Sequence, residues 1–200
     1  MINFKGLSTS CNLKIWEKIK LRNKNKGEDM KILIAYHSDT GNTEKVGMAI
    51  KKALDGEGQD VTAMAAKEVD PSTLGSYDLV VLGSGIYGQA YGKSAQNLIK
   101  NATSFPPKMA FFATHMEDHS YPKALKRIKK KLDENNCAVV GELDIVGEDI
   151  GISDALKQKM MGMMTQEERD ERIKYFEAIK GRPNADDLAK AKDFAKSLLK

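Results

Sequence analysis

Short apolar runs alternate along the chain with longer stretches in which apolar residues recur at helical spacing. The runs predict five strands, at 31–37, 60–64, 77–83, 108–114 and 137–146. The periodic stretches predict helices at 43–54, 93–101 and 122–135, and a last helix that begins near 184. Strands that alternate with helices form a parallel sheet, and right-handed crossovers place helices on both of its faces. The pattern therefore predicts a doubly wound α/β fold.

Two segments depart from this alternation. Residues 1–29 show no lasting periodicity, and they hold seven Lys or Arg residues against three Asp or Glu residues. We interpret them as a basic leader, disordered or loosely docked, upstream of a domain at 30–200. Within that domain, residues 147–183 form an irregular insertion, for which we expect one or two short helices over the sheet or its edge. Its methionines, Met160–Met164, favour simple packing, and a partner-binding surface is the alternative.

Composition narrows the classes of function. The net charge of +4 comes from the leader, since the rest of the chain is neutral, so charge gives little support for nucleic-acid binding. No apolar run approaches the roughly 20 residues that a membrane helix needs. The two cysteines, Cys11 and Cys137, fit no metal-ligand spacing, and a reduced cytoplasmic setting accounts for them. We therefore expect a cytoplasmic protein that neither binds nucleic acid nor spans a membrane.

The turn after the first strand carries a cluster of small polar residues. Ser38-Asp-Thr-Gly-Asn-Thr43 leads directly into the helix predicted at 43–54. Backbone N–H groups, hydroxyl groups and the helix dipole converge at such a turn, and all three favour an anion. The turn is not a Walker A loop, because Gly41 is followed by Asn-Thr. A phosphate would be held there by neutral donors, and a capped turn without a ligand is the alternative.

Two further loops are expected to meet this turn at the carboxyl edge of the sheet. The loop at 83–92 has glycines in the spacing of a dinucleotide fingerprint, but it follows the third strand and lacks the acidic residue of that motif. Tyr87 in this loop presents a flat ring on a flexible turn. The loop at 114–121 contains His115 and His119, which are either proton donors or solvated loop residues, with too few neighbouring ligands for a metal site.

The three loops together resemble those of flavodoxins. The polar turn is similar to the loop with which that family grips the 5′-phosphate of FMN. Tyr87 and Tyr121 resemble the two aromatic residues that stack on the flavin ring. Gly88 matches a glycine whose peptide flips when the flavin gains a proton at N5, which fits the low cost of a positive φ at glycine. The resemblance covers 30–200 apart from the insertion, and it implies a flavodoxin-like five-stranded parallel sheet in the order 2-1-3-4-5.

The resemblance also implies a cofactor and a site. FMN would be bound without a covalent bond and would carry single electrons between redox partner proteins, a reductase or ferredoxin-like donor and an acceptor enzyme. Asp118 resembles an acidic residue that disfavours an anionic reduced flavin, whereas His115 and His119 depart from the family pattern. The implied cofactor-binding residues are Ser38, Asp39, Thr40, Gly41, Asn42, Thr43, Ser84, Gly85, Ile86, Tyr87, Gly88, Thr114, His115, Asp118 and Tyr121.

Three classes of function stay open at this point. An electron carrier is favoured, since the chain shows no Ser-His-Asp, Cys-His or paired-carboxylate arrangement for a dedicated substrate. An FMN-dependent oxidoreductase that acts on a quinone or porphyrinogen is the alternative, because Gly85-Ile-Tyr-Gly88 also looks like a loop of protoporphyrinogen-oxidase-type flavodoxin-fold enzymes. A phosphate-binding or signalling module without flavin would not need Tyr87 and Tyr121 over one site.

Overall fold

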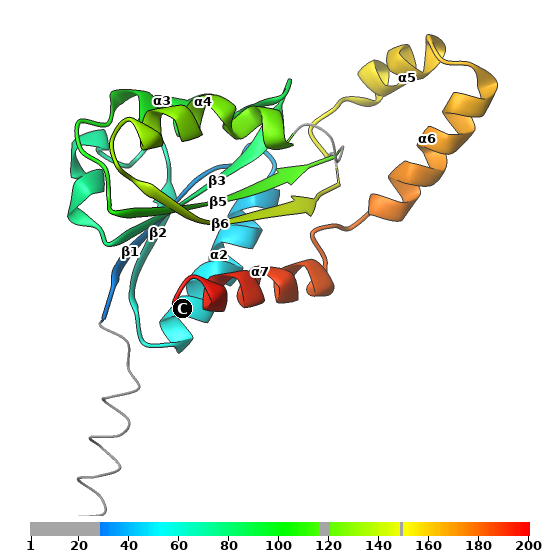
Figure 1. Cartoon of the computed structure of the whole chain (residues 1–200). Coiled ribbons are helices and arrows are strands. Elements are labelled where there is room, and N and C mark those ends of the chain that lie inside the picture. The colour runs from blue at the N-terminus through cyan, green and yellow to red at the C-terminus, as the bar shows by residue number, and fades with distance from the viewer. Residues whose placement is uncertain (1–28, 117–120, 149) are drawn as a thin grey trace, which may run out of the picture.

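The computed structural model describes residues 29–116, 121–148 and 150–200 (Figure 1). The predicted leader lies outside the described residues except for Asp29. The structure confirms the α/β fold, with a parallel sheet in the order β2-β1-β3-β5-β6, which is the 2-1-3-4-5 order of the prediction. The parallel strands are β1 (Lys31–His37), β2 (Asp60–Ala65), β3 (Leu79–Tyr87), β5 (Lys108–His115) and β6 (Ala138–Val146). A short strand, β4 (Ala90–Tyr91), pairs antiparallel with the end of β3.

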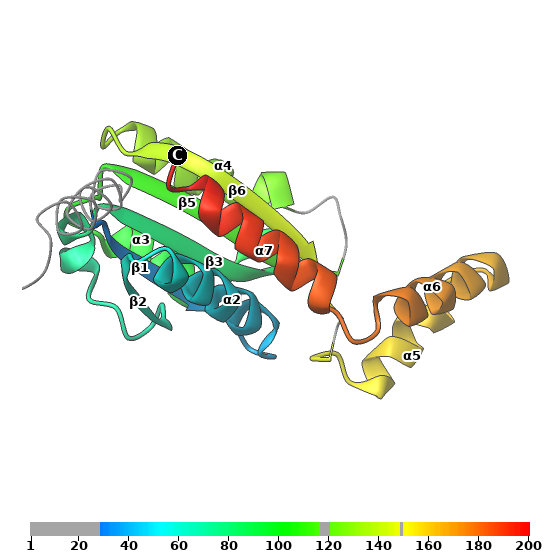
Figure 2. The ribbon, with the colours of Figure 1, turned by 90° about the horizontal axis from the view of Figure 1, so that it is seen from below.

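Helices cover both faces of this sheet (Figures 1 and 2). The helices α3 (Lys93–Asn101) and α4 (Tyr121–Asp133) lie over one face, and a 3-10 helix, η1 (Pro71–Ser76), lies near α3. The opposite face is covered by α2 (Asn42–Gly56) and α7 (Ala185–Ser197). Two apolar cores result, one on each side of the sheet. The middle strands are apolar almost throughout because both of their faces are buried.

The last helix follows the sequence prediction closely. Asn184 caps α7, and its side chain accepts hydrogen bonds from the backbone N–H groups of Asp186 and Asp187. The apolar side of α7 packs into the core shared with α2, through Ala191, Ala195 and Leu198, with Leu188 and Phe194 against them. The helix therefore closes the domain by covering the sheet beside β6.

Strand register brings the carboxyl ends of the three middle strands together. His37 of β1 pairs with Ser84 of β3, and Gly85 pairs with Thr114 of β5. A glycine is needed just before this edge, since a Cβ at Gly83 would lie 2.0 Å from the Phe112 ring. The polar residues that follow these strands therefore share one edge of the sheet, as the order of elements predicts.

The region around 83–92 differs from the prediction of a loop. The strand β3 continues through Tyr87, and Gly88 and Gln89 form a tight turn back into β4. Both turn residues have positive φ, +56° and +68°, as a type I′ hairpin turn requires. The glycine-rich composition hid a strand because glycine has low β propensity. The ring of Tyr87 is consequently held on a β-hairpin.

The insertion at 147–183 contains the two expected helices, α5 (Asp154–Gly162) and α6 (Gln166–Ile179). The sequence predicted these helices over the sheet or its edge. They instead project away from the sheet as a pair (Figures 1 and 2). Ser153 caps α5, and Thr165 and Glu168 form a capping box at the start of α6. No helix in the described part of the chain is long and apolar enough to cross a membrane.

Candidate functional site

A cavity of about 670 Å³ lies at the carboxyl edge of the sheet. Its volume falls within the range of pockets that hold small molecules and cofactors. The walls come from the turns after β1, β3, β5 and β6, which the sheet order brings side by side. The lining residues are Asp39, Thr40, Asn42, Thr43, Gly85, Ile86, Tyr87, Gly88, Gln89, Thr114, His115, Met116, Lys123, Gly147, Glu148, Gly151 and Ile152.

One end of the cavity is formed by the polar turn and the first residues of α2. Gly41 adopts a φ of +88°, and its N–H donates to the Ser38 hydroxyl at 3.1 Å. The turn thereby presents the N-terminus of α2 to the cavity, where backbone N–H groups and the helix dipole favour an anion. Thr40 and Asn42 line this end, whereas Ser38 and Gly41 shape the turn without lining the cavity.

A buried hydroxyl pair lies under this end of the cavity. Thr43 Oγ1 and Thr114 Oγ1 are 2.7 Å apart, and both side chains are buried. Each hydroxyl carries one proton, so the hydrogen bond between them uses one proton and leaves the other for a further acceptor. The pair joins the polar turn to the end of β5, and it offers a neutral donor to a ligand in the cavity.

The β3–β4 hairpin forms a second wall. The Tyr87 ring is 43% exposed at the cavity, and it meets the His37 imidazole edge-on with centroids 5.4 Å apart. Ser84 is buried and does not line the cavity. Its hydroxyl donates to the Gly85 carbonyl and accepts from the Gly92 N–H, both at 2.7 Å. Ser84 therefore holds the hairpin in shape rather than facing a ligand.

The third loop supplies less of the predicted site than expected. Thr114 and His115 line the cavity, but Asp118 and His119 lie outside the described residues. Tyr121, predicted to stack on a flavin, is 7% exposed and belongs to the core beneath α4. Tyr121 is the first residue of α4, and burial of its aromatic ring in that core contributes more favourable free energy than an exposed position would. Burial raises the pKa of its hydroxyl far above the ordinary value.

His115 has an unusual environment for a histidine. Its side chain is 2% exposed, and Nε2 lies 3.3 Å from the Asp144 carboxylate at the end of β6. The other nitrogen, Nδ1, is buried and has no hydrogen-bond partner among the described residues. A buried nitrogen without a partner costs free energy, so a polar group in the adjoining cavity would be stabilised by bonding to it.

The fourth wall comes from the insertion and was not predicted. Gly147, Glu148, Gly151 and Ile152 of the insertion line the cavity. Three other lining residues outside the insertion were not predicted either, namely Gln89, Met116 and Lys123. The turn at 147 follows β6, whose carboxyl end lies at the same edge as those of β3 and β5. The rule that ligands bind beyond these strand ends could have identified it.

Both ends of the insertion are tied to the polar turn and the first turn of α2. The Asn42 amide donates to the Glu148 carbonyl at 2.8 Å, and Lys45 Nζ donates to the Pro183 carbonyl at 2.5 Å. Glu148 in turn donates its N–H to the Arg182 carbonyl at 2.9 Å. The Tyr175 hydroxyl of α6 also donates to the Met116 carbonyl at the cavity wall.

A partly buried ion pair lies where the chain returns from the insertion to α7. The Arg182 guanidinium donates two hydrogen bonds, at 2.6 and 2.9 Å, to the carboxylate of Asp187 in the first turn of α7. These hydrogen bonds hold the pKa of Asp187 below its ordinary value. Within the described ranges, no group of three or more His, Cys, Asp or Glu residues could hold a metal ion. The Cys137 thiol is buried away from this edge, and burial raises its pKa to about 11.

Comparison with known proteins agrees with this architecture. The model of the flavodoxin domain family matches residues 33–196. The chain belongs to the flavodoxin family. The match includes the polar turn, the hairpin, the insertion and most of α7. The flavodoxin fold therefore accounts for the sheet order and for the position of the cavity.

Three similar proteins illustrate the relationship. An uncharacterized protein of Methanocaldococcus jannaschii is 30% identical over 173 residues, which cover 86% of this chain and 99% of the relative. A flavodoxin of Maridesulfovibrio salexigens is 28% identical over 120 residues, covering 56% of this chain and 82% of that protein. The crystal structure of oxidised flavodoxin 2 from Bacillus cereus has a TM-score of 0.58 at 22% identity, covering 84% and 97% of the two chains.

Proposed function

We propose that this protein binds FMN in the cavity and transfers single electrons between redox partner proteins, a donor and an acceptor enzyme. One observation carries the proposal. A helix N-terminus with neutral hydroxyl donors and an exposed aromatic ring line the same cavity, at the edge where this fold binds ligands. A phosphate and a planar ring are the two parts of FMN that need such partners.

The phosphate end of the cavity fits a dianion. Thr40, Asn42 and Thr43 would hold the phosphate, together with the first N–H groups of α2. Hydrogen bonds to a charged group contribute about 1.5–3 kcal/mol each, so a few neutral donors suffice without a lysine or arginine in the turn. The bond between Thr43 and Thr114 keeps both hydroxyls in place before the ligand arrives.

The other end fits a planar ring system. FMN, when bound, supplies reversible electron transfer, and the protein contributes binding, orientation and electrostatics. The Tyr87 ring would cover one side of the flavin and limit its contact with water. His115 Nδ1 would find in the ligand the hydrogen-bond partner that it lacks among the described residues.

The second candidate function is an FMN-dependent oxidoreductase acting on a quinone or porphyrinogen. One observation favours it. Buried His115 lies at the cavity wall with the exposed Asp144 carboxylate 3.3 Å from its Nε2, and a histidine oriented by a carboxylate is able to move a proton to or from a substrate. The electron carrier is preferred because His115 has an equally direct role in holding the cofactor through its Nδ1 atom.

Cofactor titration followed by reduction tests the proposal. The purified chain should show the visible spectrum of bound FMN, and FAD should bind poorly because the helix N-terminus suits a terminal dianion. Reduction of the loaded protein should give two well-separated one-electron potentials. Equal affinity for FMN and FAD would contradict the cofactor assignment. A single two-electron step would favour the oxidoreductase over the carrier.

A further inference from the structure

The helices on the two faces of the sheet differ in charge. In α3 and α4, eight residues are lysine or arginine, two in α3 and six in α4, and a single residue, Asp133, is acidic. The helices α2 and α7 on the opposite face carry six basic and five acidic residues. The positive charge of the covering helices is therefore concentrated on the α3–α4 side.

Three lysines of α4 form one exposed stripe. Lys123, Lys126 and Lys130 follow the spacing i, i+3, i+7, which places them on one side of a helix, and all three are exposed. The buried residues of α4 belong to the core on its other side. No ion pair joins Lys123 or Lys126 to another described residue, and Lys130 lies 3.9 Å from the Glu134 carboxylate. The stripe thus presents its charge to solvent.

The neighbouring lysines hold the two helices in place. Lys129 pairs with Glu142 of β6 at 2.6 Å, and Lys131 Nζ donates to two carbonyl groups in the last turn of α3, at 2.8 and 2.7 Å. These contacts fix α4 beside α3, whose own lysines, Lys93 and Lys100, are also exposed. The exposed lysines of both helices therefore belong to one face.

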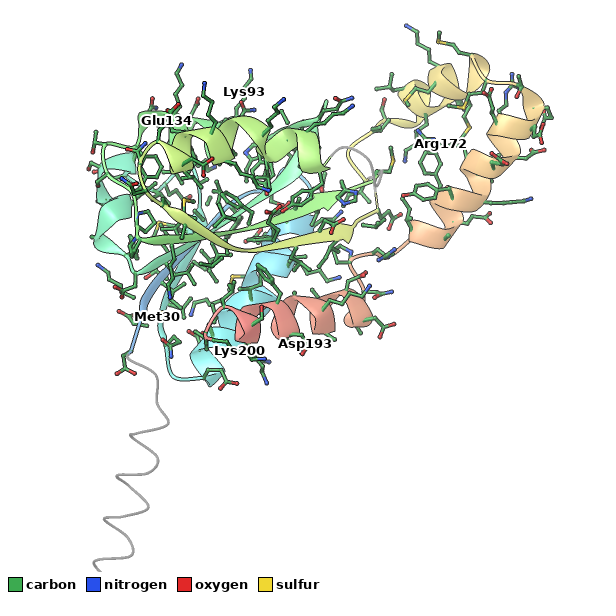
Figure 3. The ribbon with its side chains drawn as sticks, in the orientation of Figure 1. Met30, Lys93, Glu134, Arg172, Asp193 and Lys200 are labelled. Carbon is green, nitrogen blue, oxygen red and sulfur yellow. The ribbon has the colours of Figure 1, made fainter. Side chains whose placement is uncertain are left out.

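This basic face begins at the cavity. Lys123 lies in the first turn of α4 and lines the cavity. Figure 3 shows Lys93 on the outer side of the α3–α4 layer and Glu134 at the end of the layer away from α5 and α6. The cavity wall itself also includes Asp39 and Glu148, so the positive charge comes from the face beside the opening. A molecule bound to the face would lie next to the cavity.

The composition of the face indicates what it binds. No exposed large apolar side chain of the described residues lies in α3 or α4, so the face lacks the apolar side with which helices enter a membrane surface. The described part of these helices likewise offers no exposed aromatic ring on which a base of a nucleic acid would stack. Lysines alone attract carboxylates over long range and give the fast, weak association that electron-transfer proteins use.

We propose that the α3–α4 face, with Lys123, Lys126 and Lys130 at its centre, binds an acidic redox protein beside the cavity. Carboxylates of the partner would meet the lysines while its redox centre approaches the cavity opening. One electron would pass between FMN and that centre, without a bond being formed or broken. The inference rests on the proposed function and adds to it the charge of the partner and the face that receives it.

Cytochrome c in two charge forms tests the inference. The native protein is basic, and succinylation of its lysines makes it acidic. At low salt, the reduced FMN-loaded chain should transfer an electron to the acidic form at least about tenfold faster than to the native form, because charge steering raises association rates by roughly 10–10³. The difference should shrink as ionic strength rises. Equal rates, or a faster reaction with the native form, would overturn the proposal.

Two triple variants locate the effect on one face. The first replaces exposed lysines of α3 and α4 and should lower the rate with the acidic form at least about fivefold, namely Lys93→Gln, Lys126→Gln and Lys130→Gln. The second removes the same charge from exposed positions of α2 and α7 and should change the rate little, namely Lys52→Gln, Lys190→Gln and Lys192→Gln. The visible spectrum should show FMN bound to both. Equal effects of the two variants would overturn the assignment to the α3–α4 face.

Binding measured without FMN separates this inference from the proposed function. Calorimetry of the cofactor-free chain with acidic cytochrome c should show salt-sensitive binding that the first variant weakens and the second does not. A chain that shows this binding but takes up no FMN would contradict the proposed function alone. A chain that takes up FMN but lacks this binding would contradict the basic face alone. Equally tight binding of double-stranded DNA or phosphatidylserine vesicles, lost in the first variant, would also overturn the assignment to an acidic protein.

Discussion

The cavity edge of the sheet and the α5–α6 hairpin are built in opposite ways. At the edge, β1, β3 and β5 are buried on both faces, and the residues after them are fixed by hydrogen bonds such as that between Thr43 and Thr114. In the hairpin, a single side chain of α6 is buried among the described residues. The comparison indicates that the edge is held in place by the buried sheet and its hydrogen bonds, whereas the hairpin contributes almost no buried side chains to the domain.

The largest expected effect concerns ligand binding at the edge. Thr40→Ala combined with Thr43→Ala removes two hydroxyl donors to a phosphate, at about 1.5–3 kcal/mol each. FMN affinity, measured by fluorescence titration, should fall at least about a hundredfold. Thr103→Ala, an exposed threonine away from the cavity, is the control. Unchanged FMN affinity in the double variant would show that the polar turn is not the phosphate site.

The stability of the fold should depend on the ion pair between Arg182 and Asp187, which joins the insertion to α7. Asp187→Asn removes the charge that pairs with Arg182 and should lower the free energy of unfolding by about 3 kcal/mol, the low end for a buried pair. The low end applies because the Arg182 side chain is 25% exposed. Urea unfolding near pH 7 measures the effect, and Asp193→Asn, at an exposed position of the same helix, should change it little. An equal loss in both variants would contradict the assigned ion pair.

The same pair predicts a pH dependence. The pKa of Asp187 is lower in the folded protein than in the unfolded chain, so ionisation stabilises the fold above the unfolded pKa of about 3.9. This contribution is lost as the pH falls through the folded pKa. The stability difference between the wild type and Asp187→Asn should therefore shrink in acid, measured by urea unfolding across that range. A difference that stays constant would exclude the linkage.

Two Gly→Ala variants compare the packing of the sheet directly with that of the α5–α6 hairpin. Gly83→Ala places a Cβ 2.0 Å from the Phe112 ring in the core and should destabilise the fold by about 1–3 kcal/mol. Gly162→Ala on α5 meets nothing within 4 Å and should stabilise the chain by up to about 1 kcal/mol. Thermal unfolding of both variants should show opposite shifts. Shifts of the same sign would mean that the hairpin is packed as tightly as the sheet.

A smaller effect is expected at the tip of the β3–β4 hairpin. Rotation of the Gly88–Gln89 peptide would convert the type I′ turn into type II′, which requires glycine at its first position. Gly88→Ala should disfavour that conversion by about 1–3 kcal/mol, because the first position of a type II′ turn lies in backbone that is nearly exclusive to glycine. The two one-electron potentials of the FMN-loaded protein should move closer together, while affinity for oxidised FMN stays similar. Unchanged potentials would exclude a role for this peptide.

Most of the fold could be predicted from apolar patterning. The predicted helix at 93–101 matches α3, and most other boundaries differ by only a few residues, because strands buried on both faces leave continuous apolar runs. The β3–β4 hairpin was missed since its glycines resemble a loop. The direction of the α5–α6 hairpin was missed because its helices lack the apolar stripe of a helix packed on a sheet.

The site was predictable where residues follow a strand end. Ten of the fifteen predicted residues line the cavity, including Thr40, Tyr87 and His115. Tyr121 does not, because spacing along the sequence cannot distinguish a ring over a cavity from a ring in the adjacent core. Glu148 and Ile152 were missed because their position depends on where the insertion crosses the edge of the sheet.

Calorimetric titration of the cofactor-free protein with FMN and with riboflavin tests the central claim most directly. The two ligands share the ring and differ in the phosphate. If the N-terminus of α2 and its hydroxyls bind that phosphate, FMN should bind at least about a hundredfold more tightly, since two charge-assisted hydrogen bonds give about 3 kcal/mol. Equal affinity for the two ligands, or no binding of FMN, would contradict the assignment of this cavity.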